Sequence, residues 1–267
     1  MKLFKRDFTK LTKREETIWL KLKKLEIMKR GRFPITRSCF RKYPKAARHF
    51  VHLFPNNYLD VVELKKTRRL QTMVAKFRVL LKSPRLTERG ILKMIREEGA
   101  YFIIGSILKD NFNFGHHEAY LFPEFPLGTS HRADYLLVGK SSGGSQFVFV
   151  ELEAPSKNIT VQNGDFGKAF RSGHNQVTDW RAWLDANYQT LSDVFRKLKK
   201  SDMELPAEFM RFDRSRVHFV IVAGRRDDFK EKTYRIRRNG RQTGDALILH
   251  YDNVLDAAEA IVGKETY

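Results

Sequence analysis

Residues 146–155 read QFVFVELEAP, and this stretch decides the fold class of the chain. A run rich in Phe and Val is typical of a buried β-strand, and this one ends at two glutamates, Glu151 and Glu153. A second apolar run, RADYLLV at 132–138, carries Asp134. The turn-forming segment GKSSGGS joins the two runs, so the pattern predicts a β-hairpin with acidic residues near one end.

The segments around this hairpin alternate between helical and strand-like patterns. We expect a helix from Thr87, a good N-cap, to about residue 108, with Ile91, Ile95 and Phe102 buried. The remaining expected elements are strands at 119–125, 216–223 and 246–251, a helix at 165–187 and a short C-terminal helix. The order predicts a mixed α/β fold, with a central mixed β-sheet flanked by helices.

The first 86 residues differ from the rest in charge. They hold 25 Lys and Arg against 6 Asp and Glu, whereas the whole chain of 267 residues has 51 against 31 and a net charge of +20. Apolar spacing predicts helices at about 11–28 and 58–81, so we expect a basic, mainly helical region at 1–86 and a second domain at 87–267. Such a charge favours binding of nucleic acid; an anionic membrane surface is the alternative.

Composition excludes several other classes of protein. No apolar run approaches the roughly 18 residues of a membrane-spanning helix, and the first 16 residues lack the apolar segment of a secretory signal. Cys39 is the only cysteine, which excludes an internal disulfide framework and any multi-cysteine metal site within one chain. We therefore expect a cytoplasmic protein that does not bind membranes.

The acidic residues in the predicted strands need a physical reason, because a buried carboxylate without a partner is costly. Strand alternation places Glu151 and Glu153 on one face, and Asp134 lies on the neighbouring strand. Three carboxylates at close range favour a hard cation such as Mg²⁺ or Mn²⁺. The alternative is that they form ion pairs with Arg132, Lys140 or Lys157 at a sheet edge.

These residues also form part of a longer series of motifs. FVFVELEAPSK, HNQVTDWRAWLDAN, FVIVAGRRDDF and ILHYDNVLD follow one another along the chain. The series resembles the C-terminal nuclease domain of the Shedu antiphage defence proteins over about residues 88–262. The resemblance implies a restriction-endonuclease-like core with a PD-(D/E)xK-type site, metal-dependent cutting or nicking of DNA, and homo-oligomer formation.

The same resemblance implies roles for particular residues. Asp134 and Glu151 match the metal-binding acids of the motif, and the carbonyl of Leu152 would complete the metal site. Glu153 occupies the position where the general motif has a lysine, which normally orients the attacking water. Glu153 would then bind the metal or position water, with Lys157 assisting.

Three further residues are candidates for the same site. Gln176 lies on the polar side of the predicted helix at 165–187, and a polar residue there helps to position the nucleophile in folds of this kind. Lys168, near the start of that helix, is an alternative to Lys157 in the role of the missing lysine. Glu98 can face the site, although an ordinary surface charge is the favoured interpretation.

The sequence therefore predicts an endonuclease or nickase that acts on double-stranded DNA with Mg²⁺ or Mn²⁺ in bacterial defence against phages. The alternative is a nucleic-acid-binding or sensing protein whose nuclease site is degenerate at Glu153. An RNA nuclease would differ only in substrate, and no base-reading motif distinguishes the two.

Overall fold

The computed structural model describes residues 1–30, 33–156, 159–162, 165–242 and 246–267. A five-stranded sheet forms its centre. In spatial order the strands are β3 (Glu118–Leu127), β4 (His131–Ser141), β5 (Gly144–Leu152), β6 (Val217–Val222) and β7 (Leu247–Leu249). β3, β4 and β5 are antiparallel to one another, whereas β5, β6 and β7 are parallel. The predicted mixed α/β fold with a mixed central sheet is confirmed.

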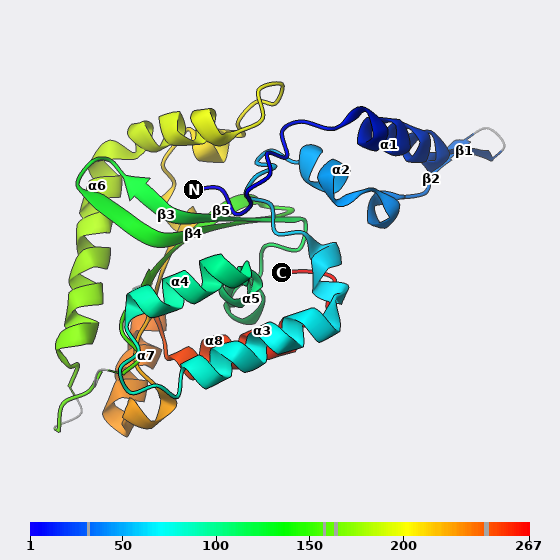
Figure 1. The fold of residues 1–267 in the computed structure, drawn as a ribbon. Coiled ribbons are helices and arrows are strands. Elements are labelled where there is room, and N and C mark those ends of the chain that lie inside the picture. Colours follow the sequence, from blue (N-terminus) through cyan, green and yellow to red (C-terminus); the bar gives the residue numbers. More distant parts are fainter. Residues whose placement is uncertain (31–32, 157–158, 163–164, 243–245) are drawn as a thin grey trace.

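Helices cover both faces of the sheet (Figure 1). On one face lie α3 (Thr67–Leu80), α4 (Glu88–Glu98), α5 (Phe102–Asn111) and α8 (Tyr251–Ile261), and on the other lies the long helix α6 (Lys168–Leu198). The remaining α-helices are α1 (Lys13–Glu26), α2 (Lys45–Phe50) and α7 (Glu231–Gln242). No helix in the described residues is long and apolar enough to cross a membrane.

Strand alternation divides the core between the two faces. Val148 and Val150 of β5 belong to the cluster under α5 and α8, whereas Phe147 and Phe149 belong to the cluster with Trp180 of α6. Both faces of β5 are therefore buried. This explains why its sequence is an unbroken apolar run until the two glutamates at its end.

The basic N-terminal region contains one long exposed helix and one helix that enters the core. Helix α1 has no fully buried residue, and its Trp19 and Leu22 pack against a small cluster of Cys39, Tyr43 and Ala47. The hairpin of β1 (Ile27–Arg30) and β2 (Phe33–Thr36) follows it. In contrast, α3 contributes Met73 and Phe77 to the core shared with α5 and α8. Figure 1 shows α1 and the hairpin projecting from the rest of the molecule.

Several predicted helix boundaries were wrong, and the helix expected at 165–187 instead runs from Lys168 to Leu198. The expected helix at 87–108 is two helices, because Gly99 adopts φ +64° and ends α4. The helix expected at 58–81 begins only at Thr67, after a 3₁₀ turn at Val61–Lys65. The first helix ends at Glu26, where the chain enters β1.

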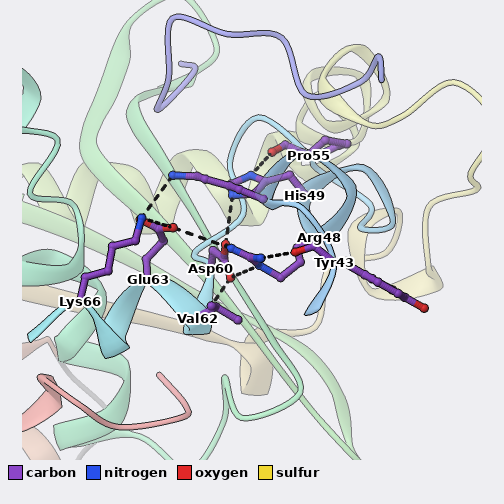
Figure 2. A network of polar contacts seen from close by, with 9 residues as sticks. Tyr43, Arg48, His49, Pro55, Asp60, Val62, Glu63 and Lys66 are labelled. Atoms are coloured by element: carbon purple, nitrogen blue, oxygen red, sulfur yellow. Dashed lines mark hydrogen bonds and ion pairs between the residues drawn. The ribbon is translucent and has the colours of Figure 1, made fainter. Parts of the chain in front are cut away.

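A buried network of polar contacts holds the segment before α3 in place (Figure 2). Arg48 of α2 forms an ion pair with Asp60 at 2.9 Å and also donates to the carbonyl of Tyr43. His49 Nδ1 lies 2.8 Å from the carbonyl oxygen of Pro55, and burial lowers the pKa of His49 to about 4. At neutral pH this ring is therefore uncharged and donates through Nδ1. Arg48 serves the fold here, so it is not one of the cations available at the surface.

Candidate functional site

The register of β4 and β5 brings two carboxylates together. Tyr135 pairs with Val150, so the next residues outward, Asp134 and Glu151, lie opposite each other across the two strands. The backbone N–H of Leu152 donates to Asp134 Oδ2 at 2.8 Å and fixes the orientation of this carboxylate. Glu151 is 5% exposed and Asp134 is half-buried.

Helix α6 supplies the contacts on the outer side of this pair. The side-chain amide of Gln176 donates a hydrogen bond to the Glu151 carboxylate. Further toward the N-terminus of α6, Gly173 lies so close to β5 that a Cβ there would be 3.2 Å from Glu153 Cγ. Gln176 and Gly173 therefore set the distance between α6 and the two glutamates.

Glu153 lies just beyond the end of β5 and is held by its backbone. Its N–H donates to the carbonyl of Val222 at 2.8 Å, and its carbonyl accepts from the hydroxyl of Tyr251 at 2.7 Å. Glu153 is 9% exposed as a residue, and its side chain packs against α6 at Gly173. The strand edge, α8 and α6 thus hold this acid in place together.

The electrostatics of the pair are unfavourable for two ionised carboxylates. Burial is the largest cause that raises the pKa of both Asp134 and Glu151 above the usual range. The negative charges of Glu88 and Glu153 raise both pKa values further, and Asp134 itself acts on Glu151. The hydrogen bonds from Leu152 and Gln176 lower the two pKa values, but this does not offset the increase caused by burial. A bound cation would relieve this repulsion.

The donor atoms fit magnesium or manganese. In the ranges that the structure describes, no three His, Cys, Asp or Glu side chains are close enough to hold a metal ion by themselves. Mg²⁺ does not require three, because it commonly keeps several waters and binds through one or two carboxylates. Asp134 and Glu151 supply two such carboxylates. The carbonyl of Leu152, between the two glutamates, remains a predicted ligand.

The cations expected as partners of these acids lie elsewhere or outside the described residues. Arg132 pairs with Glu124 at 3.9 Å, and Lys140 pairs with Glu118 at 3.7 Å. Lys157, expected to assist at the site, lies outside the described residues. Lys168 is the first residue of α6, and its side chain is exposed.

Glu88 belongs to the site although the sequence pattern did not indicate it. It is the first residue of α4, directly after the N-cap Thr87, and its charge raises the pKa of both Asp134 and Glu151. An acid in the first turn of a helix is ordinarily explained by the helix dipole, so its position carried no signal of a site. Glu98, at the other end of α4, instead pairs with Lys76 at 2.8 Å, as expected of a surface charge.

A comparison with protein families matches more than half of the chain. The family described as Shedu protein SduA, C-terminal, matches residues 85–255. The matched segment contains Glu88, Asp134, Glu151, Glu153 and Gln176, together with all five strands of the central sheet. No curated protein matches the chain.

Proposed function

The chain belongs to the Shedu family of antiphage defence proteins, and we propose that it hydrolyses phosphodiester bonds of DNA with Mg²⁺ or Mn²⁺ held by Asp134 and Glu151. The observation that carries this proposal is the pair itself. Two carboxylates face each other at the ends of apolar strands, and each is oriented by a hydrogen bond to its oxygen. Such a pair is costly unless a cation binds there.

The residues around the pair have separate tasks in this proposal. A divalent cation, when bound, stabilises charge on a phosphate oxygen and lowers the pKa of bound water. Leu152 fixes Asp134 through its N–H and offers its carbonyl as a further ligand, while Gln176 fixes Glu151. Glu153 binds the metal or positions the attacking water in place of the lysine of the general motif. Lys157 assists in this proposal, as the sequence motif suggests.

The basic N-terminal region supports DNA as the substrate. Helix α1 exposes Lys13, Arg14, Lys21, Lys23 and Lys24, and Figure 1 shows this helix standing clear of the sheet and its helices. Exposed cations on a projecting element can contact phosphates without disturbing the core. We propose double-stranded DNA as the substrate, a cytoplasmic location, and action as a homo-oligomer.

Plasmid cleavage tests the proposal. Supercoiled plasmid is incubated with the protein in Mg²⁺, in Mn²⁺ and in excess EDTA, and relaxed and linear products are measured. Glu151→Gln keeps the shape and the contact with Gln176 but removes the charge, so we expect cleavage to fall at least ~10²-fold. Glu98→Gln removes the same charge from the far end of α4 and should leave cleavage unchanged.

Two results would overturn the proposal. One is wild-type cleavage that persists in excess EDTA, and the other is near-normal cleavage by Glu151→Gln. A wild-type protein that binds DNA but neither cleaves it nor takes up Mn²⁺ would instead be a sensing protein with a degenerate site at Glu153.

A further inference from the structure

A large cavity lies beside the carboxylate pair. Its volume is about 810 Å³, and its walls come from residues 1–5, from α4 and from the ends of β3 and β4. Asp134 and Glu88 are both on its wall. The cavity therefore reaches the candidate metal site from the side opposite to α6.

Exposed cations from three separate segments line this cavity. They are Lys2, Lys5, Arg89, Lys93, Arg96 and Arg132. Arg89, Lys93 and Arg96 are spaced by four and three residues, so they lie in one row along α4. The lysines of the N-terminal segment belong to another wall of the same cavity.

Within the part of the chain that the structure describes, half of these six cations have no ion-pair partner, and the other three, Lys2, Lys93 and Arg132, form only exposed pairs at 3.9–4.0 Å. Among the described residues, Lys5, Arg89 and Arg96 have no ion-pair partner within 4.0 Å. Lys93 meets Glu97 only at 4.0 Å, in an exposed pair. Exposed pairs of this length contribute little energy, so a phosphate can replace the carboxylate easily. The cavity is therefore suited to a polyanion.

The size of the cavity limits which polyanion can enter. A volume of about 810 Å³ lies within the range of about 300–1,000 Å³ that is typical of small-molecule sites. The major groove of B-form DNA alone is about 12 Å wide, so an intact duplex is too wide to enter. A single strand is narrow enough to enter, and its charged backbone can follow a positively charged groove.

We propose that this cavity receives a single-stranded segment of the nucleic-acid substrate, with its phosphates on the cations of α4 and its path leading to Asp134. This inference rests on the proposed nuclease function for its biological meaning, but the binding itself does not require cleavage. It predicts that the protein prefers DNA with an unpaired arm over a blunt duplex of the same length.

Binding in EDTA tests the inference without any contribution from metal or cleavage. Fluorescence anisotropy is measured with labelled oligo(dT), with a blunt hairpin duplex and with a forked duplex that carries an unpaired arm. The cavity variant is Arg89→Glu with Lys93→Glu. The matched control is Lys109→Glu with Lys197→Glu, which makes the same charge change at two exposed lysines outside the cavity wall.

We expect the cavity variant to bind oligo(dT) at least ~10-fold more weakly. The slope of log K against log salt concentration should be less steep by about 0.7 for each phosphate that the variant no longer neutralises. The control should change affinity less than about two-fold, and only the wild type and the control should prefer the forked duplex. Circular dichroism and thermal unfolding establish that the variants are folded. If the double charge reversal does not fold, Arg89→Gln with Lys93→Gln replaces it.

The inference is overturned if both double variants weaken binding equally, or if the blunt duplex binds as tightly as the forked one. If either of these results is obtained but Glu151→Gln abolishes plasmid cleavage, the proposed nuclease function is supported and the proposed role of the cavity is rejected. If only the cavity variant loses oligo(dT) binding and the wild type never cleaves DNA, the cavity binds single strands and the proposed nuclease function is rejected.

Discussion

The backbone N–H of Leu152 donates to Asp134 Oδ2 at 2.8 Å, so the acid on β4 is oriented by the main chain between Glu151 and Glu153. Any movement of the β5 end therefore moves all three acids together. Asn at position 134 can still accept this bond, but it carries no charge. The substitution Asp134→Asn therefore removes the charge of this residue while it keeps the hydrogen bond that orients the side chain.

Asp134→Asn should stabilise the metal-free protein at alkaline pH. Because the folded-state pKa of Asp134 is raised, folding is disfavoured once pH exceeds the unfolded value near 4, and the penalty grows until pH passes the folded value. Each unit of difference corresponds to about 1.4 kcal/mol. Urea unfolding in EDTA should show that the variant gains more free energy of unfolding over wild type at pH 8 than at pH 5. A variant that is less stable than wild type at pH 8 would contradict the repulsion between these carboxylates.

Metal binding should strengthen as pH rises. Asp134 and Glu151 must lose their protons before they bind a cation, and both pKa values are raised. A bound ligand at 100 times its Kd stabilises the fold by about 2.7 kcal/mol. We expect Mn²⁺ to raise the Tm of the wild type more at pH 8 than at pH 5.5, and not to raise that of Glu151→Gln. Equal shifts in wild type and variant would place the metal elsewhere.

Gly173→Ala should impair cleavage without destabilising the protein. A Cβ at this position would lie 3.2 Å from both Glu153 Cγ and Ile221 Cγ2, so the Glu153 side chain must shift. Alanine in a helix is favoured over glycine by about 1 kcal/mol, which offsets the crowding. We expect cleavage to fall by roughly ten-fold, because small displacements of catalytic groups are costly. Gly143→Ala, in an open turn, is the control and should cleave normally.

The ion pair of Arg48 and Asp60 should be important for stability and not for chemistry. The side chains are 8% and 1% exposed, and Asp60 also accepts from the N–H of Val62 at 3.1 Å. Removing one partner of a buried pair costs about 3–5 kcal/mol, so Arg48→Ala should lower the free energy of unfolding by that amount. The comparison is Arg196→Ala, which breaks an exposed pair with Asp193 and should cost less than about 1 kcal/mol. Similar losses in the two variants would show that Arg48 is not a buried anchor.

The sheet could be predicted from the sequence because its strands are buried on both faces or alternate clearly. The predicted strands at 119–125, 132–138 and 146–152 all lie within β3, β4 and β5. The turn-forming residues between β4 and β5 indicated the hairpin, and the register in the structure then shows that Asp134 lies opposite Glu151. The catalytic roles of these residues remain predictions.

Other features of the fold and the site depend on tertiary contacts, which cannot be predicted from the spacing of apolar residues. The apolar stripe of α1 resembles that of α3 in spacing, yet α3 packs into the main core against α8, whereas α1 packs against the short helix α2 and the small cluster beside it. Glu88 and Glu98 are both acids at the ends of one helix. Only the packing of α4 decides that the first lies beside the carboxylate pair and the second beside Lys76.

The exposure of α1 and its hairpin also affects how the protein behaves in solution. Ile18 and Leu25 of α1 and Ile27 and Ile35 of the hairpin are between 38% and 67% exposed. Helix α1 also exposes Lys13, Lys21, Lys23 and Lys24. At low ionic strength, repulsion between these lysines keeps the apolar side chains of neighbouring molecules apart. The Debye length falls from about 10 Å at 0.1 M salt to about 3 Å at 1 M. Salt that releases DNA should therefore bring the projecting helices together, so colloidal stability is lowest in the buffers ordinarily used to strip nucleic acid from a basic protein.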